Sequence, residues 1–368
     1  MSNFLLYAPD ELKEYVQRFL VRHEVPPEDA AIVADVLITA DLRGVSSHGI
    51  IRLDTYYGNR LRRGLIDPRT PISVVNETAA TLSIDAGNGL GHVAGKHAML
   101  RCIRKAAEVG VAMATVRNSN HYGIAGYYAM LALENDMIGI SFTNSQPLVA
   151  PTHGRKAVLG TNPIAVAAPG LNERPYVLDM ATSIVPIGKI TVYDKMREPI
   201  PAGWGVNSDG LVTENPGDVL RGGALMPLGG TEELRGYKGY GLAMLVDIFS
   251  GVLAGAGFGP EVGSVKSEHP TNVGHFFAAV RIDAFHPADE FKMDMDRLIR
   301  MMKDSPKAAG QERIFIHGEK EFERYEQYTR EGVPLLIEVV HSLEQAGEEV
   351  GVPFDLHPIG QQATLEEE

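Results

Sequence analysis

The sequence contains little cysteine and has no excess of basic residues, and both shortages limit what the chain can be. Cys102 is the single cysteine among 368 residues, which excludes an intrachain disulfide framework and a cysteine-cluster zinc site. The net charge of −13 argues against nucleic acid as a partner, because such binding needs lysine and arginine to neutralise phosphates. A chain with one cysteine fits a reducing compartment, so we expect a cytoplasmic protein.

The sequence also lacks a long apolar run. Its most apolar window, residues 241–259, contains Asp247 and five glycines, whereas a membrane span needs about 20 consecutive apolar residues. We interpret this window as a buried helix that ends at glycines, and we expect no membrane partner. The first residues, MSNFLLYAPDELKEY, have no basic segment followed by an apolar stretch, so we expect no secretory signal.

What remains is the composition of an ordinary globular protein, with 44% hydrophobic and 22% charged residues. Apolar residues at helical spacing predict helices over 10–21 and 28–42. Short apolar runs bounded by Gly, Pro and Asn predict strands over 80–86, 111–116, 137–143, 163–169, 176–180 and 275–282, with helices over 96–109 and 127–135 between them. Helical spacing returns over 294–303 and 334–345. We predict a helical domain of residues 1–75 joined by 290–368, and a mixed α/β domain of residues 76–289.

A glycine-rich loop between the first of these strands and a helix looks like a dinucleotide-binding fingerprint but departs from it. Gly87, Gly89, Gly91 and Gly95 do not give the spacing G-x-G-x-x-G, since position 92 is His. The next strand leads into Arg117 and Asn118, not into the acidic residue that the fingerprint requires. We therefore expect a non-Rossmann fold. The loop is either a tight turn with close packing or an anion site at a helix N-terminus.

The segment ADLRGVSSHGIIRLDTYYGNRLRRG, residues 40–64, carries the first candidate site. Gly44 can end one helix and Ser46 or Ser47 can cap the next, which places His48 in its first turn and Arg52 one turn further along. A 2-oxo acid needs a fork-shaped cation for its carboxylate and a proton donor beside its carbonyl oxygen. The pair supplies both groups. On spacing alone, a lone histidine near a helix start is more often a structural or exposed residue.

A second histidine, His121, lies in RNSNHYGIAGYYAML, between a predicted strand and a predicted helix. Loops at such junctions are where binding residues collect. The other interpretation of this loop is a helix cap that contains an ordinary histidine.

Seven motifs, taken together, resemble the type-2 malate/L-lactate dehydrogenase family, which includes ureidoglycolate, sulfolactate, diketogulonate and cyclic imino acid oxidoreductases. The motifs are ADLRGVSSHGIIR, NSNHYGIAGYYA, GTNPIAVAAP, LDMATS, GK at 188–189, IPAGW and YKGYGLAMLVDIFSGVLAGA. The resemblance implies an α/β (α+β), non-Rossmann fold: a central, largely antiparallel sheet domain plus a helical domain from both termini. It also implies a homodimer, a nicotinamide cofactor, and a small 2-hydroxy/2-oxo acid substrate, with malate/oxaloacetate or L-lactate/pyruvate expected first.

The resemblance also implies roles for individual residues. His48 or His121 exchanges the proton, with His48 placed first, and Arg52 holds the substrate carboxylate. Further substrate-binding positions are Ser47, Thr161 and Asn162. The implied cofactor positions are Ser145, Leu178, Asp179, Met180, Lys238, Gly239, His317, Gly318 and Glu319. Asp179 favours NAD, because a carboxylate can accept hydrogen bonds from ribose hydroxyls, and NADP remains the alternative.

One position departs from the family. Related sequences commonly carry aspartate where this chain has Asn207, so either Asn207 or Asp209 is expected to orient the catalytic histidine. Three other functions stay open: a ureidoglycolate, sulfolactate, diketogulonate or cyclic imino acid enzyme on the same scaffold, a small-anion binding protein, and a metal-dependent hydrolase. The last is disfavoured, and no metal site is expected, since H-E-x-x-H is absent and His269 and His275 are flanked by Pro and Gly.

Overall fold

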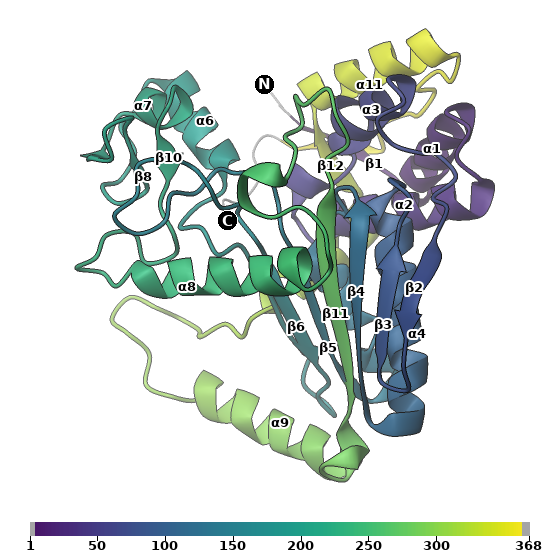
Figure 1. The fold of residues 1–368 in the computed structure, drawn as a ribbon, viewed down its shortest axis with the longest axis vertical. Helices are drawn as coiled ribbons and strands as arrows, with labels where there is room; N and C mark the ends of the chain where they lie inside the picture. Colours follow the sequence, from purple (N-terminus) through teal and green to yellow (C-terminus); the bar gives the residue numbers. More distant parts are fainter. Residues whose placement is uncertain (1–3, 363–368) are drawn as a thin grey trace.

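The computed structural model of the protein describes residues 4–362, and its centre is a seven-stranded sheet (Figure 1). The strand order is β2-β3-β4-β11-β5-β6-β7, and every neighbouring pair is antiparallel except β3 and β4. The strands are β2 (Ser73–Glu77), β3 (Thr81–Asp85), β4 (Val111–Ser119), β5 (Met137–Thr143), β6 (Ile164–Ala168), β7 (Tyr176–Met180) and β11 (Val273–Arg281). The expected non-Rossmann, largely antiparallel sheet is confirmed.

Both faces of this sheet are covered, and neighbouring residues of β11 point to opposite faces. Phe277 packs edge-on against Tyr128 of α5 (Ala125–Met130), on the face that also carries α4 (Gly91–Val109). Phe276 packs against Phe249 of η4 (Asp247–Val252) on the other face. Burial on both faces explains why β11 is buried from Val273 to Ala279 and mainly apolar, whereas β5 alternates between buried and half-buried positions. A short 3-10 turn, η3 (Leu133–Asn135), lies between α5 and β5.

Elements from the first and last parts of the described chain come together in a helical region at the upper right of Figure 1. There β1 (Phe4–Tyr7) lies between β12 (Val333–Leu336) and β13 (Gly360–Gln362). Around it pack α1 (Pro9–Arg22), α2 (Pro27–Leu42), α3 (Asn59–Arg62), α10 (Glu319–Glu331) and α11 (Ile337–Val350). The helix expected over 334–345 was wrong in its first residues, because Val333–Leu336 pairs with β1 as a strand. The domain boundaries at 75 and 290 remain a prediction.

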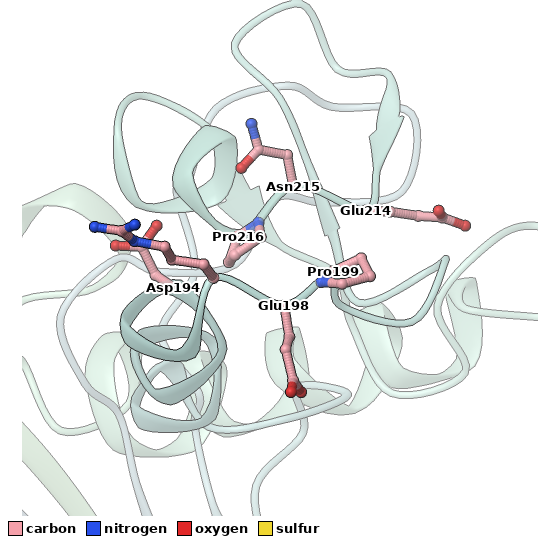
Figure 2. Close-up of a pocket in the computed structure, with 7 residues that line it drawn as sticks. Asp194, Glu198, Pro199, Glu214, Asn215 and Pro216 are labelled. Atoms are coloured by element: carbon pink, nitrogen blue, oxygen red, sulfur yellow. The ribbon is translucent and has the colours of Figure 1, made fainter.

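A small lobe stands apart from the main sheet at the upper left of Figure 1. It contains α6 (Ile187–Met196), α7 (Pro216–Leu220) and a three-stranded sheet of β8 (Gly205–Val206), β9 (Val212–Thr213) and β10 (Ala224–Leu225). A cavity of about 520 Å³ lies in this lobe (Figure 2) and is lined by Asp194, Arg197, Glu198, Pro199, Glu214, Asn215 and Pro216. None of the site residues expected from the sequence lines it.

The apolar window at 241–259 forms α8 (Tyr237–Val246) and the π-helical η4, and the expectation that it is buried was wrong. Ala243 and Val246 face the interior, but Ile248 is 50% exposed and Leu253 60% exposed. Further exposed apolar side chains on this outer face are Tyr237, Leu242, Met244, Leu245 and Val252. We call these seven residues the α8 face. Within residues 4–362, no helix is both long and apolar enough to cross a membrane.

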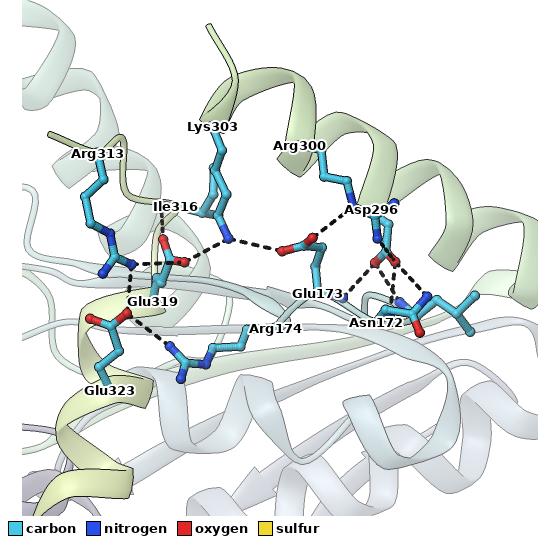
Figure 3. A network of polar contacts seen from close by, with 11 residues as sticks. Asn172, Glu173, Arg174, Asp296, Arg300, Lys303, Arg313, Ile316, Glu319 and Glu323 are labelled. Atoms are coloured by element: carbon cyan, nitrogen blue, oxygen red, sulfur yellow. Dashed lines mark hydrogen bonds and ion pairs between the residues drawn. The ribbon is translucent and has the colours of Figure 1, made fainter. Parts of the chain in front are cut away.

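Helix α9 (Ala288–Lys303) and the following segment run along the lower edge of the molecule in Figure 1 and are joined to β7 by charged side chains. The buried Asp296 accepts hydrogen bonds from the backbone N–H groups of residues 171–173, in the turn before β7. Lys303 bridges Glu173 at 3.1 Å and Glu319 at 2.8 Å. The ionic network, drawn in Figure 3, comprises Glu173, Arg174, Asp296, Arg300, Lys303, Arg313, Glu319 and Glu323.

Candidate functional site

His48 lies in a tight turn that follows α2. Gly44, with a φ of +77°, ends that helix, and Ser46–His48 forms a single 3-10 turn, η1, in place of the regular helix expected. Neither serine caps a helix. Instead, the Ser47 hydroxyl lies 2.9 Å from His48 Nδ1, and Arg52 Nε donates to the Ser47 carbonyl at 2.8 Å. Ser47, His48 and Arg52 therefore form one unit, in which the serine connects the histidine to the arginine.

A buried carboxyl holds this turn in place. Asp41 Oδ2 accepts the backbone N–H of Ile50 at 2.7 Å, and a side chain at Gly49 would collide with the same carboxyl group. Burial raises the pKa of Asp41 to about 8, with the Ile50 hydrogen bond opposing the shift. Asp41 was missed in the sequence, although an acidic residue within the apolar second half of this helix, between Ala40 and Leu42, was a signal that could have found it.

His121 meets His48 across the site. It follows β4, whose end positions the loop, and its ring stacks on that of His48 with centroids 5.4 Å apart and planes 24° apart. Tyr57, in the π-helical turn η2 (Leu53–Gly58), places its hydroxyl 2.5 Å from His121 Nδ1. The two histidines proposed as alternatives are thus neighbours in one site, and Tyr57 is a third member that no sequence pattern indicated.

Both histidines are neutral at physiological pH. Desolvation, and then the positive charge of Arg52, lower the pKa of His48 to about 4. Desolvation also holds the pKa of His121 well below 6.5, and the positive charge of Arg52 lowers it further. Neutral imidazoles next to a guanidinium can exchange a proton and hydrogen-bond an oxygen, while the arginine attracts a carboxylate. The arrangement suits a small acid that carries a hydroxyl or carbonyl group.

The close packing of the glycine loop supports this site from below. The position of a Cβ at Gly91 would lie 2.1 Å from the Asn120 carbonyl oxygen and 2.7 Å from that of His121. Asn120 donates to the carbonyls of Asn88 and Gly89. The glycines therefore allow α4 to approach the His121 loop, which matches the close-packing interpretation of this loop.

Three of the expected cofactor residues lie on β7, an edge strand of the main sheet. Leu178 and Met180 pair with β6, and Asp179 between them has an exposed side chain whose Oδ2 accepts the Gly126 N–H at 2.7 Å. The Gly126 hydrogen bond and the charge of Arg43 favour the ionised form of this carboxyl group. A carboxylate in this position can accept hydrogen bonds from ribose hydroxyls.

The segment His317–Glu319 lies alongside the same strand. The His317 carbonyl accepts the Val177 N–H at 3.0 Å, and Gly318, with a φ of +88°, packs against Val177. The Glu319 carboxylate is engaged by Lys303 at 2.8 Å and Arg313 at 3.3 Å within the ionic network (Figure 3). This segment is therefore adjacent to Asp179, but the Glu319 side chain serves the network.

Ser145, Thr161 and Asn162 form a second cluster. Ser145 Oγ lies 3.2 Å from Thr161 Oγ1 and accepts the Thr161 N–H at 3.0 Å, while Asn162 Oδ1 accepts the Ser145 N–H at 3.1 Å. Lys238 and Gly239 begin α8, where a Cβ at Gly239 would lie 2.3 Å from the Leu228 carbonyl oxygen. Lys238 is exposed. The structure connects the first three residues to one another through hydrogen bonds.

Asn207 and Asp209 lie in the turn between β8 and β9. Asn207 Oδ1 accepts the N–H groups of Asp209 and Leu211, both at 3.0 Å, so this side chain stabilises its own turn. Asp209 is exposed and lies 3.8 Å from Arg155. Their contacts with residues 4–362 do not include His48 or His121, so the orienting role stays a prediction that this chain's own geometry does not favour.

Comparison with known proteins gives the same family throughout. The family model described as malate/L-lactate dehydrogenase matches residues 7–344. The chain is 48% identical to malate dehydrogenase of Pyrococcus abyssi, with 95% of this chain and 96% of that one covered. It is 40% identical to L-sulfolactate dehydrogenase of Methanocaldococcus jannaschii, with 95% and 99% covered. The crystal structure of malate dehydrogenase from Entamoeba histolytica has a TM-score of 0.91 at 36% identity, with 96% and 99% covered.

Proposed function

Because the chain belongs to the malate/L-lactate dehydrogenase family and is a dehydrogenase with a nicotinamide cofactor, we propose that it interconverts malate and oxaloacetate with NAD. The observation that carries the proposed chemistry is the stack of His48 on His121 beside Arg52. Malate is proposed ahead of L-lactate because the relatives at 46% and 48% identity are named malate dehydrogenase.

Arg52 and His48 have different roles in this reaction. Arg52 uses one nitrogen, Nε, to bind the Ser47 carbonyl, which leaves its two terminal nitrogens for the substrate carboxylate. His48 presents Nε2 to the substrate hydroxyl, since its Nδ1 is next to the Ser47 hydroxyl. During oxidation the hydroxyl proton passes to His48 Nε2, and in the reverse direction His48 returns it to the oxygen. A nicotinamide held by the expected cofactor residues would supply the acceptor for the hydride of carbon 2, which together with the proton taken by His48 would account for the two electrons and two hydrogens that the hydroxy acid loses.

The chemistry of the expected cofactor residues fits a dinucleotide. The hydroxyls of Ser145 and Thr161, the carboxylate of Asp179 and the ammonium group of Lys238 are suited to an amide, ribose hydroxyls and a pyrophosphate. A side chain at Gly188 or Gly241 would meet no atom within 4 Å, so both positions leave open space. We assign Asp179 to the ribose, and its negative charge disfavours the additional phosphate of NADP.

We also propose that the protein is a homodimer in the cytoplasm. The α8 face gathers seven exposed apolar side chains on two consecutive helical segments, and exposed apolar surface of this kind is a feature of subunit interfaces. Ile248→Asp would place a charge in it and should convert a dimer to a monomer in light scattering. A dimer that survives this substitution would count against the α8 face. The single, buried Cys102 fits a reducing compartment.

A steady-state survey tests the proposed function. NADH and NADPH are each offered with oxaloacetate, pyruvate, sulfopyruvate and a cyclic imino acid, and loss of the reduced nicotinamide absorbance is followed. We expect the highest kcat/KM for NADH with oxaloacetate. A higher kcat/KM for another acid would identify that acid, and not malate, as the substrate. If neither nicotinamide is oxidised with any of the acids, a small-anion binding protein would be favoured.

A further inference from the structure

Tyr57 is the least exposed member of the candidate site. Its ring is fully buried and packs edge-on against the ring of His92 at 4.7 Å and that of Tyr56 at 4.9 Å. His92 is itself fully buried, and neither of its ring nitrogens has a hydrogen-bond partner among residues 4–362. This packing leaves the Tyr57 side chain one position, with its hydroxyl against His121.

Two donors converge on a single nitrogen of His121. The Tyr57 hydroxyl lies 2.5 Å from Nδ1, and the backbone N–H of Gly123 donates to the same atom at 3.3 Å. A backbone N–H can only donate, so Nδ1 must be an acceptor. The proton of a neutral imidazole then resides on the other nitrogen, Nε2, because the hydrogen bonds at one ring nitrogen decide the state of the other.

The electrostatic surroundings agree with this assignment. Burial raises the pKa of Tyr57 well above 10, so its hydroxyl keeps the proton that it donates. The pKa of His121 is held well below 6.5 by desolvation, and the positive charge of Arg52 lowers it further. The His121 ring is therefore neutral and carries one proton, on either Nδ1 or Nε2.

We propose that Tyr57 is a positioning residue: together with the Gly123 N–H it fixes His121 as the Nε2–H tautomer, which assigns different roles to the two histidines. This inference rests on the proposed function. His121 donates a hydrogen bond from Nε2 to the substrate oxygen and keeps its proton throughout the reaction. His48 is the group that gains the hydroxyl proton in oxidation and returns it in reduction, so the proton balance involves His48 alone.

The neighbouring Tyr56 has a different function. Its hydroxyl accepts the backbone N–H of His121 at 3.5 Å, so it contacts the main chain of the loop and not the ring nitrogen. Loss of the Tyr56 hydroxyl should make the loop less rigid but should leave the tautomer of the His121 ring unchanged. Tyr56 thus supports the backbone of the His121 loop, whereas Tyr57 controls the tautomer of the His121 ring.

The first test reads the tautomer directly and needs no activity. Nitrogen-15 NMR of protein labelled at histidine distinguishes a protonated from an unprotonated ring nitrogen, and His121→Gln assigns the signals. We expect His121 in the unliganded wild-type protein to be protonated at Nε2 and unprotonated at Nδ1. A proton on Nδ1 would overturn the proposal, even if the enzyme oxidises malate as proposed.

The second test uses Tyr57→Phe, with Tyr15→Phe as the matched control. Tyr15 is also fully buried, and its hydroxyl donates to the Leu343 carbonyl at 2.9 Å in the helical region, away from the site. Tyr57→Phe should lower kcat about 10- to 100-fold, as loss of a supporting hydrogen bond does, and should give mixed His121 tautomers. The KM for the acid should change by no more than about twofold, because Arg52 is untouched.

The control should retain both its kcat and the wild-type tautomer. Tyr57→Phe with a kcat close to wild type, or with the Nε2–H tautomer intact, would contradict a positioning role. If instead the wild-type protein shows the expected tautomer but oxidises no hydroxy acid, the failure belongs to the proposed function and not to the geometry of Tyr57.

Discussion

The histidine pair and the ionic network are held together by opposite means. The pair is maintained by ring stacking, by the hydrogen bond between Ser47 and His48, and by hydrogen bonds from Tyr57 and Gly123 to His121, and desolvation keeps both rings uncharged. The network joins α9 to the β7 edge through full charges, and cations lower the pKa of carboxyls such as Glu173. One region removes charge from groups that must exchange a proton, whereas the other uses charge to fix a segment.

Because of this difference, we expect changes near the histidine pair to affect turnover and changes in the ionic network to affect stability. Groups that act through an uncharged ring should affect kcat when they are changed and leave folding mostly intact. Members of the network should affect the free energy of unfolding and leave the chemistry intact.

His48→Ala removes the group that exchanges the proton. We expect kcat to fall by roughly 10²- to 10⁴-fold, the usual contribution of general acid–base catalysis, with cofactor affinity unchanged. Stopped-flow turnover and cofactor titration by fluorescence measure the two quantities. Full turnover in both His48→Ala and His121→Ala would show that neither histidine is the acid–base catalyst.

Asp296→Ala should give the largest loss of stability in the network. The buried carboxylate accepts the N–H groups of Leu171, Asn172 and Glu173, and its removal leaves these donors unpaired. We expect a loss of about 3 kcal/mol in the free energy of unfolding, measured by urea denaturation, with kcat nearly unchanged. Asp294→Ala, which affects an exposed carboxylate on the same helix, is the control. A variant that unfolds like the control would show that the network carries little stability.

Arg52→Ala tests the carboxylate contact within the site. Loss of the forked guanidinium should raise the KM for the acid about 10- to 100-fold, with a smaller effect on kcat, because a charge-assisted hydrogen bond contributes about 1.5–3 kcal/mol. Arg52→Lys keeps the charge but not the fork, and should lie between wild type and Arg52→Ala. An unchanged KM in both variants would place the substrate carboxylate elsewhere.

The pH dependence of stability should follow the buried histidines before the network. Desolvation lowers the pKa of the fully buried His92 and His275 from 6.5 to about 3. Below pH 6.5 the unfolded chain binds protons that the folded chain does not, so stability is complete above that pH and falls as the pH drops toward 3. The loss should be about 1 kcal/mol per histidine at about pH 5.5.

Carboxyls of the network behave differently. The pKa of Asp296 is lowered from 3.8 by the N–H groups around it against an opposing desolvation, so its contribution persists until the pH falls below about 4. Urea denaturation at a series of pH values separates the two phases. Equal stability at neutral pH and at about pH 5.5 would contradict the burial of neutral histidines.

Arg174→Gln should have the smallest effect. Arg174 pairs with Glu323 at 3.3 Å and Glu326 at 2.9 Å, and all three side chains are partly exposed. Surface pairs of this kind contribute less than about 1 kcal/mol and weaken in salt. We expect a slightly lower melting temperature at low salt and no difference at high salt. A large loss that salt does not reduce would mean that the outer part of the network is as important as Asp296.

The sequence predicted the parts of this molecule that depend on local pattern. The helices near 10–21 and 28–42 and most strands of the main sheet follow from apolar spacing, and His48 and Arg52 follow from their separation of four residues. The short strand Val333–Leu336 was not predicted, because its conformation is decided by pairing with β1 at the other end of the chain. Its local pattern is equally typical of a helix.

Contacts between distant segments also had no local signal. Tyr56 and Tyr57 are adjacent and chemically identical, and only the folded chain directs the Tyr57 hydroxyl to the His121 ring. The exposed α8 face has a similar cause. Its sequence is mostly apolar, which is typical of burial, and the sequence alone does not show which part of that surface the chain itself covers.

A crystal structure with NAD and an unreactive 2-hydroxy acid analogue would test the account most directly. The account predicts the analogue's carboxylate on the Arg52 guanidinium and its hydroxyl within about 3.2 Å of His48 Nε2, with His121 Nε2 as a second partner. An analogue bound outside this site, with neither histidine in contact with its hydroxyl oxygen, would contradict the central claim that the stacked histidines are where the chemistry takes place.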